Sequence, residues 1–357
     1  MRIALFRDGP LLPPRDGATY SIHGLITALA KTGMEVFLFR CFRGWDDPVL
    51  YKKEPFTTIF LREKDFYCKT GLAKRLLKKF RISIVQFDSP EIMLRNKILK
   101  EDNFAFVWEV HGVDSYLLKT LGNSRSTIDN IRAIEREALK TSDVVLCRSR
   151  VDRDQLAAVY PKARSKMHII RGCIDPSKLL IIKPDLGSRN VLLLGNFYYQ
   201  PNVRMVKLAS KIHKRLRTHG IRFLLLGDAP DSLVRKLSAE GFEFLGFKKD
   251  LNKIFRKCAL AISPLDRGSG TRLKILDFLA GGLPVIATSK AVEGLEKIEK
   301  VVVIEDKLER YPQKILELFE NRKRLNNLSK NGKHFVNKEY NWSNQIQRVI
   351  KAYGSLD

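Results

Sequence analysis

The sequence lacks the features that mark several classes of protein. It contains five cysteines, none of them in a CxxC pair, so neither a disulfide framework nor a zinc site is expected. No run approaches about 18 consecutive apolar residues, so the sequence predicts no transmembrane helix. The N-terminal stretch MRIALFRDGP turns polar at once, unlike a secretory leader. Scattered thiols are typical of a reducing compartment, and we expect a cytoplasmic location.

Common nucleotide and nucleic-acid signatures are also missing. The GxG at residues 268–270 is not a dinucleotide fingerprint, because Leu273 stands where the third glycine would be, and no Walker A run occurs. The chain has no RNP, helix-turn-helix or zinc-finger pattern. We therefore expect no specific nucleic-acid partner.

Positive charge, by contrast, is abundant. The chain of 357 residues has 65 Lys and Arg against 39 Asp and Glu, a net charge of +26 that is spread over both halves. Such a field favours an anionic partner, namely nucleic acid, an anionic membrane surface or a phosphorylated substrate, without choosing among them. Hydrophobic residues make up 44%, enough for ordinary cores, and the length predicts about two domains.

Short apolar runs alternate with helical patterns along the chain. Strands are expected at 2–7, 35–42, 56–61, 82–87, 104–110, 143–147, 167–170, 191–195, 223–227, 242–246, 260–264, 284–288 and 301–304. Helices are expected at 18–33, 71–80, 90–100, 124–142, 150–159, 201–219, 230–240, 249–257, 272–280 and within 307–354. The pattern breaks at 172–189, which we interpret as a linker. The rhythm predicts an α/β fold with two doubly wound parallel sheets.

The most informative segment is RGSGTRLKILDFLAGGLPVIAT, residues 267–288. A strand ends before it, and a loop with Gly268 and Gly270 leads into a helix. Glycines there let backbone approach a ligand, and the N–H groups of a helix start attract anions. Arg272 and Lys274 oppose the helix dipole at this end. Their presence indicates a bound anion, although a plain β–α turn with solvated charges gives the same pattern.

This segment resembles the donor-site signature of retaining GT-B glycosyltransferases of family 4. Other stretches agree in order: DGATYSIHGLITALAKTGMEVFLF, WEVHG, SDVVLCRS, IIRGCIDPSKL, VLLLGNFYYQPN and YNWSNQIQRVIKAY. The resemblance implies a GT-B fold, with two Rossmann-like domains facing a central cleft. It implies an acceptor-binding domain at 1–175, joined by a C-terminal helix at 341–357, and a nucleotide-sugar-binding domain at 176–340.

The resemblance also implies roles for single residues. The backbone at Gly270, Thr271, Arg272 and Leu273 would hold the donor diphosphate, and Asp277 would bind the ribose hydroxyls. Asn196 and Phe247 match donor-contacting positions, with Phe247 placed at the nucleobase. In the N-terminal domain, Gly17 matches a glycine loop and His111 a histidine near the reacting centre. As alternatives, Asp277 is a solvated helix residue, Gly17 a turn glycine, and His111 a hydrogen-bonded loop residue.

Two positions depart from the family pattern. Ser269 stands where a glutamate usually touches the transferred sugar, and the loop GNFYYQPN supplies Asn196 but no cation. We expect Arg272 and Lys274 to stabilise the leaving diphosphate instead. His111, Arg272 and Lys274 are thus the candidate catalytic residues.

Two other stretches need separate interpretation. Asp152-Arg153-Asp154 spells the DxD metal motif of another glycosyltransferase fold, but it falls in a predicted first helical turn, where acids favour the dipole. We expect no metal or other cofactor. Residues 69–81 combine leucines at helical spacing with the cations Lys74, Arg75, Lys78, Lys79 and Arg81, which is typical of a helix on an anionic membrane or of a surface helix packed on the core.

The leading hypothesis is a metal-independent retaining hexosyltransferase that moves a sugar from a nucleotide-sugar to a hydroxyl of a glycan or lipid-linked acceptor. Polysaccharide biosynthesis and peripheral membrane attachment would follow from it. The alternatives are a nucleotide-sugar epimerase of the same architecture, a basic nucleic-acid-binding protein, and a catalytically degenerate relative. The resemblance in the linker and final helix disfavours the epimerase.

Overall fold

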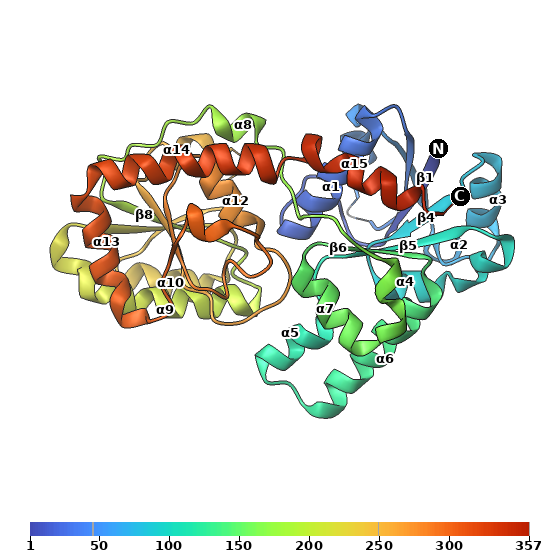
Figure 1. The fold of residues 1–357 in the computed structure, drawn as a ribbon, viewed down its shortest axis with the longest axis horizontal. Coiled ribbons are helices and arrows are strands. Elements are labelled where there is room, and N and C mark those ends of the chain that lie inside the picture. The colour runs from blue at the N-terminus through green and yellow to red at the C-terminus, as the bar shows by residue number, and fades with distance from the viewer. Residues whose placement is uncertain (45, 249, 357) are drawn as a thin grey trace. The chain divides into compact units, whose positions relative to one another are not determined.

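A computed structural model describes residues 1–44, 46–248 and 250–356 (Figure 1). The chain forms two compact units. The first comprises residues 1–173, 269–271 and 342 onward, and the second comprises residues 174–268 and 272–341. The chain thus enters the second unit and returns to the first.

Within its described residues, the first unit holds a seven-stranded parallel sheet in the order β3-β2-β1-β4-β5-β6-β7. The strands are β1 (Arg2–Arg7), β2 (Glu35–Cys41), β3 (Thr57–Leu61), β4 (Ile84–Phe87), β5 (Ala105–Val110), β6 (Val144–Cys147) and β7 (Met167–Ile169). Central strands are buried throughout because helices cover both faces of a parallel sheet. Phe6 and Phe39 stack on adjacent strands with ring centroids 4.8 Å apart.

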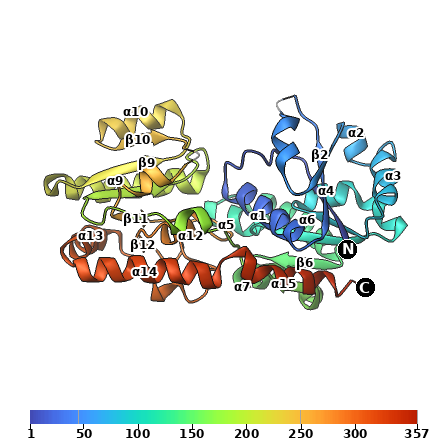
Figure 2. The ribbon, with the colours of Figure 1, turned by 90° about the horizontal axis from the view of Figure 1, so that it is seen from above.

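The helices of the first unit follow the strands in turn. They are α1 (Gly17–Lys31), α2 (Glu63–Phe66), α3 (Leu72–Lys79), α4 (Pro90–Arg95), α5 (Asp114–Leu121), α6 (Arg125–Thr141), α7 (Arg150–Val159) and α15 (Trp342–Tyr353). Short 3-10 helices are η1 (Pro48–Lys53), η2 (Lys97–Asp102) and η3 (Pro161–Lys166). The C-terminal helix α15 packs against α1 (Figure 2).

Over the described residues of the second unit, six parallel strands run in the order β10-β9-β8-β11-β12-β13. They are β8 (Asn190–Leu194), β9 (Arg222–Leu226), β10 (Glu243–Gly246), β11 (Leu260–Ser263), β12 (Val285–Ala287) and β13 (Val303–Ile304). The helices are α8 (Ser177–Leu180), α9 (Gln200–Leu216), α10 (Asp231–Ala239), α11 (Asn252–Phe255), α12 (Leu273–Ala280), α13 (Tyr311–Glu320) and α14 (Arg322–Glu339), with 3-10 turns η4 (Arg217–His219), η5 (Ile298–Lys300) and η6 (Leu308–Arg310). This is the strand order of a Rossmann fold.

Some sequence expectations about elements were wrong. The segment 112–123 was not expected to be helical, yet α5 fills most of it. The helix expected at 90–100 is α4 followed by η2, and the helix expected at 249–257 is only the short α11. The helix expected to begin at Arg272 begins at Leu273, and Arg272 is its N-cap.

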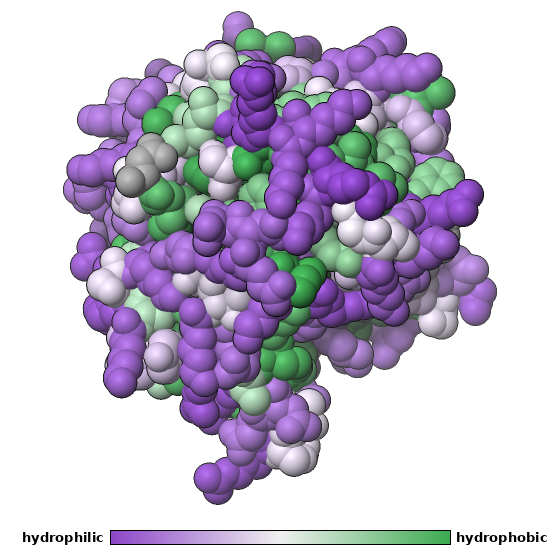
Figure 3. Space-filling view, turned by 90° about the vertical axis from the view of Figure 1, so that its right-hand side faces the viewer, coloured by the Kyte–Doolittle hydropathy of each residue, from purple (hydrophilic) through white to green (hydrophobic). Residues whose placement is uncertain are grey.

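The apolar side of α3 faces the protein. Ala73 and Leu77 are buried, and Leu72, Leu76 and Phe80 pack against the core of the first unit. Two of its lysines, Lys74 and Lys78, lie 2.5 Å from the carboxylate of Asp102. The leucines of 69–81 are therefore used in folding, and a membrane would meet mainly charge. The face of the molecule that α3 helps to form is largely hydrophilic (Figure 3).

The DxD string serves the helix in which it lies. Asp152 accepts a hydrogen bond from the hydroxyl of Ser149, whose oxygen in turn accepts the Asp152 N–H at 3.1 Å. Asp154 pairs with Arg153 and Arg164 at 3.1 and 3.0 Å. Both carboxylates thus have partners within the protein, which supports the helix-capping interpretation.

Gly24 on α1 leaves space for Trp342 of α15, the helix with which the chain returns to the first unit. A Cβ on Gly24 would overlap the indole of the buried Trp342. Gly24→Ala should lower the free energy of unfolding by about 1–3 kcal/mol through overpacking, more than alanine gains in helix propensity. Gly17→Ala is the matched control, because nothing lies within 4 Å of that Cβ. Equal urea midpoints for the two variants would contradict this account.

Candidate functional site

The second unit has its topological switch point between β8 and β11, where strand order reverses. Open α/β sheets bind ligands at the carboxyl ends of the strands that flank such a point. The segment after β8 contains Gly195 and Asn196, and the segment after β11 leads to α12 at Leu273. Both predicted donor segments of this unit therefore lie at the edge where the topology places a ligand.

The start of α12 follows a loop that contains two glycines. Among the described residues, no side chain caps this helix, and the preceding Gly268 and Gly270 have φ of +120° and +78°. The first N–H groups of a helix have no intrahelical partner and favour an anion. Arg272, only 8% exposed, brings a cation to this end, 3.8 Å from the carboxylate of Glu293. A positive charge beside an uncapped helix start is unfavourable unless an anion binds.

Asp277 lies on α12 about one turn after Leu273. Its side chain is partly buried, and burial raises its pKa to about 7. A carboxylate held in this way gains strongly from hydroxyl donors, since they favour its ionised form. The position suits a carboxylate that binds a diol.

Lys274 is held by the protein in a way that the sequence did not predict. Its Nζ donates to the carbonyl oxygen of Leu194 at 3.0 Å and to Asn202 Oδ1 at 2.8 Å. Asn202 Nδ2 in turn donates to the carbonyl oxygen of Asn196 at 2.9 Å. Burial, and then the charge of Arg272, lower the pKa of Lys274 to about 7. Lys274 thus ties α12 to the loop that carries Asn196.

Lys274→Met should loosen that loop. The substitution leaves the acceptors on Leu194 and Asn202 without their donor, and each unsatisfied buried acceptor costs about 1–3 kcal/mol. Amide hydrogen exchange over residues 194–202 should accelerate. Lys330→Met, at an exposed lysine of α14, is the control and should leave exchange there unchanged. Equal protection in both variants would show that Lys274 does not hold the loop.

Exposed aromatic side chains follow two strands of the second unit, β10 and β8. Phe247, at 36% exposure, comes directly after β10, and Tyr198, at 63%, lies in the loop after β8. The Tyr198 hydroxyl donates to the carbonyl oxygen of Ala229, beyond β9, at 3.3 Å. Tyr198 was not among the site residues predicted from the sequence, although the YY pair of GNFYYQPN was a signal. The order β10-β9-β8 brings these aromatics to one edge of the sheet.

Gly17 opens α1 in the first unit. The carboxylate of Asp16 caps this helix by accepting the Thr19 N–H at 2.8 Å, and Thr19 completes a capping box. The carboxylate of Asp16 thus already satisfies part of the N-terminus of α1. Gly17 has open space around it, so it leaves room for a ligand without itself offering a side chain.

His111 follows β5, one strand beyond the switch point between β1 and β4. Its Nε2 lies 3.4 Å from Oε1 of the fully buried Glu109, and it is itself buried. Burial, with the charges of Arg148 and Arg7, holds the pKa of His111 well below its usual value. His111 is therefore neutral at pH 7. Neither Glu109 nor Arg148 was among the site residues predicted from the sequence.

The remaining predicted residues, Ser269, Gly270 and Thr271, belong to the segment that is grouped with the first unit. The structure thus brings the predicted residues together in two groups. Asn196, Arg272, Leu273, Lys274 and Asp277 gather at the switch point of the second unit, with Phe247 two strands away. Gly17 and His111 lie at the carboxyl edge of the first sheet.

Known structures share this architecture along the whole chain. Alr3699/HepE from Anabaena, solved in complex with UDP, matches with a TM-score of 0.78 and 12% identity, covering 99% of this chain and 100% of that one. Sucrose-phosphate synthase from Thermosynechococcus elongatus matches with a TM-score of 0.78 and 17% identity, covering 100% and 99%. The fold is therefore GT-B, as the sequence predicted.

Two family models match successive parts of the chain. One is described as Glycosyltransferase Family 4 and matches residues 15–178, and the other as Glycosyl transferases group 1 and matches residues 188–321. This chain belongs to the family 4 glycosyltransferases. The uncharacterized glycosyltransferase MJ1178 of Methanocaldococcus jannaschii is 25% identical to this glycosyltransferase over 277 residues, 74% of this chain and 71% of its relative.

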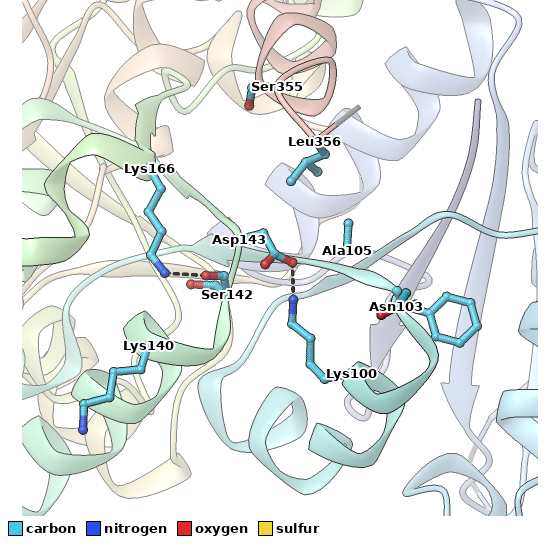
Figure 4. Close-up of a pocket in the computed structure, with 10 residues that line it drawn as sticks. Lys100, Asn103, Ala105, Lys140, Ser142, Asp143, Lys166, Ser355 and Leu356 are labelled. Atoms are coloured by element: carbon cyan, nitrogen blue, oxygen red, sulfur yellow. Dashed lines mark hydrogen bonds and ion pairs between the residues drawn. The ribbon is translucent and has the colours of Figure 1, made fainter.

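A surface hollow of about 630 Å³ lies elsewhere on the glycosyltransferase (Figure 4). The hollow lies where β5 and β6 begin. His111 follows the end of β5, so it lies at the opposite edge of the sheet. Its cations are already engaged: Lys100 binds the Asp143 carboxylate, and Lys166 donates to the carbonyl oxygen of Ser142. We therefore do not assign the transferase site to this hollow.

The described part of the glycosyltransferase contains no helix long and apolar enough to span a membrane. In the same residues, no cluster of three or more His, Cys, Asp or Glu side chains has the arrangement of a metal site. The five cysteines are unpaired, and all but Cys68 are buried.

Proposed function

We propose that this glycosyltransferase transfers a sugar from a nucleoside diphosphate sugar to a hydroxyl of a glycan or lipid-linked acceptor, with retention of the anomeric configuration. The donor would bind at the switch point of the second unit. The observation that carries the proposal is the uncapped start of α12, with a buried Arg272 beside it and Asp277 one turn further.

Each feature of this edge suits one part of such a donor. The backbone N–H groups at the start of α12 and the guanidinium of Arg272 suit a diphosphate, which carries two or more negative charges. Asp277 suits the vicinal hydroxyls of a ribose. Phe247 and Tyr198 offer exposed rings at the same edge, where a nucleobase could stack.

The chemistry that this arrangement supports is stabilisation of the leaving group. As the bond between the sugar and the diphosphate breaks, negative charge grows on the phosphate oxygen. Preorganised N–H donors and a cation stabilise that charge without a divalent metal. Lys274 would contribute by holding the loop at Asn196, and the neutral His111 by binding the sugar. We propose retention of the anomeric configuration because residues 267–288 resemble the donor-site signature of retaining enzymes of the family.

Uridine is the base to test first, because HepE was solved with UDP and with UDP-glucose. The acceptor would bind the first unit. An anionic membrane remains a proposed partner, which α3 would meet through its cations because its leucines pack inside. The unpaired cysteines support a reducing, cytoplasmic compartment.

A thermal-shift screen tests the donor proposal directly. The full chain is heated with UDP, GDP, ADP or dTDP and with their common sugars, each with and without EDTA. A ligand that binds only the folded protein raises the Tm by mass action. We expect one nucleotide to raise the Tm equally with and without EDTA.

Other outcomes would redirect the proposal. A shift that EDTA abolishes would contradict metal independence. No shift with any nucleotide would favour a degenerate relative. Binding to unrelated oligonucleotides with a steep salt dependence would instead favour a charge-driven nucleic-acid-binding protein.

A further inference from the structure

A chain of buried polar side chains runs through the first unit beside His111. Glu109 on β5 is 0% exposed, and Gln86 on the adjacent β4 is 1% exposed. Gln86 Nε2 donates to Glu109 Oε2, and the hydroxyl of Tyr353 donates to Gln86 Oε1. Tyr353 belongs to α15, which lies beside the sheet (Figure 1). The two hydrogen bonds therefore link the C-terminal helix to β4 and β5.

Arg148 completes this chain on the other side of Glu109. It follows β6, is 3% exposed, and donates from Nη2 to Glu109 Oε1. Its guanidinium lies over the ring of Trp342, 5.2 Å from the centroid. A buried ion pair gains little or no stability over apolar residues of the same volume, because both charges lose their hydration. Stability alone therefore does not explain why Glu109 and Arg148 are buried as an ion pair.

His111 supplies that explanation. Its Nε2 is buried and makes no hydrogen bond within the described residues, and it lies 3.4 Å from Glu109 Oε1, while the side chain as a whole is 19% exposed. We propose that Glu109 is a positioning residue that fixes His111 as the neutral tautomer protonated on Nε2. Nδ1 is then left as an acceptor for a hydroxyl of the sugar. The role of Nδ1 rests on the proposed function, but the tautomer does not.

The tautomer follows from the chemistry of the partners. Burial raises the pKa of Glu109, whereas the charge of Arg148 and the hydrogen bond from Gln86 lower it. Arg148 and Gln86 donate to its two oxygens, as they would to the ionised carboxylate, which only accepts. The ring nitrogen that faces it is favoured as the protonated one, as for a metal-bound histidine oriented by a carboxylate. The positive charges of Arg148 and of Arg7, which is itself paired with Asp88, oppose a second proton.

A fixed tautomer has a consequence for specificity. Neutral imidazole has one donor and one acceptor, and here the donor would be turned to Glu109. The acceptor on Nδ1 would accept a hydrogen bond from a sugar hydroxyl. A site built in this way rejects an analogue that lacks the hydroxyl, because a polar atom is left unpaired.

Nitrogen NMR tests the inference without any substrate. The full chain is labelled with ¹⁵N-histidine, and the ring signals of His111 are assigned among the six histidines by their loss in His111→Gln. We expect the shifts of an Nε2–H tautomer, unchanged from about pH 6 to about pH 8. An Nδ1–H tautomer, or titration near the ordinary histidine pKa, would overturn the inference.

Variants of the buried network separate positioning of His111 from folding. Glu109→Gln leaves Arg148 buried without its counter-charge and is expected to be unstable. The double variant Glu109→Leu, Arg148→Met removes both charges, and His111 should then show a mixture of tautomers. Tyr353→Phe, three contacts away from His111, should keep the Nε2–H tautomer. A double variant that folds, as judged by near-ultraviolet circular dichroism, and keeps the pure tautomer would contradict the role of Glu109.

Failure of this inference and failure of the proposed function are distinguishable. A protein with the Nε2–H tautomer that binds no nucleotide in the thermal-shift screen contradicts the proposed function and retains the Glu109–His111 pair. A protein that binds a nucleotide but carries the other tautomer contradicts only the positioning role.

Discussion

Asp277→Asn is expected to weaken UDP binding by about 10- to 100-fold, the largest loss that we anticipate from a near-isosteric change in the site. Hydrogen bonds to a charged group contribute about 1.5–3 kcal/mol, and each 1.4 kcal/mol is a tenfold change in Kd. The amide keeps the shape of the side chain but loses the charge and one acceptor. Isothermal titration calorimetry with UDP measures the effect.

The pH dependence of binding gives the same prediction a second readout. Burial raises the pKa of Asp277 to about 7. Ribose hydroxyls favour the ionised form, so UDP affinity should rise as the pH is raised through 7 and fall below it. In Asp277→Asn this dependence should flatten on the acidic side. A wild-type affinity that is independent of pH between about 6 and about 8 would contradict the role of the carboxylate.

Asp277→Asn should weaken UDP binding but should not lower the stability of the folded protein. A carboxyl whose folded pKa lies above its unfolded value of about 3.9 costs stability as the pH rises through the folded pKa. Asp277→Asn removes that cost, so the variant without ligand should melt at or above the wild-type Tm at pH 8. Weaker binding together with an undiminished Tm separates loss of function from loss of fold.

An exposed acid of the same unit provides the control for Asp277. Glu320 ends α13 and is exposed. Glu320→Gln removes the same unit of charge far along the chain from α12 and should leave both the UDP affinity and its pH dependence at wild-type values. Equal losses in Glu320→Gln and Asp277→Asn would show that net charge alone governs binding.

The sequence predicted the two Rossmann-like sheets because their signal is local and repeated. A run such as VLLLG at 191–195 is apolar on both faces and short, which is typical of a buried parallel strand. β8 spans Asn190–Leu194, one residue away from the expected bounds. The loop and helix at α12 could be predicted for the same reason, since a strand end, two glycines and a helix start follow one another there.

What the sequence did not predict depends on contacts between distant residues. The same leucines on α3 fit a membrane or a core, and only the packing at Leu72 and Leu76 decides. Lys274 looked like a phosphate ligand from its place in the first helical turn, but its acceptors on Leu194 and Asn202 lie some 70 or more residues earlier. A lysine in a motif carries no sign of such partners.

The network around His111 was hidden for the same reason. Glu109 was visible as a polar residue within an apolar strand, and that is the signal that could have marked it. Its partner Arg148, however, follows a different strand, and no local spacing connects the two. Register between β5 and β6 brings them together, with Val110 opposite Cys147.

Gly227→Ala should destabilise the second unit by at least about 4 kcal/mol, in the range of the most damaging single substitutions. Gly227 follows β9 with φ of +133°, a conformation that L-residues rarely adopt. A Cβ there would also overlap the carbonyl oxygen of Gly195. Both backbone segments are held in place by hydrogen bonds. The N–H of Gly195 donates to the carbonyl oxygen of Leu226, and the N–H of Gly227 donates to that of Gly246, both at 3.0 Å.

Gly220→Ala is the matched control for this prediction. Gly220 also has positive φ, at +65°, but nothing lies within 4 Å of its Cβ. It should cost about 1 kcal/mol from backbone conformation alone. The difference between the two variants isolates the overlap with Gly195. Similar losses in both would show that positive φ, and not the close approach of β8 and β9, sets the requirement for glycine.

The placement of tryptophan lets the two units be followed separately. Within the described residues, the tryptophans are Trp108 and Trp342, and both belong to the first unit. Urea unfolding of Gly227→Ala followed by far-ultraviolet circular dichroism should show an early transition, while tryptophan emission should keep the wild-type midpoint if the first unit folds on its own. Coincident early transitions in both signals would instead show that the first unit depends on the second for its stability.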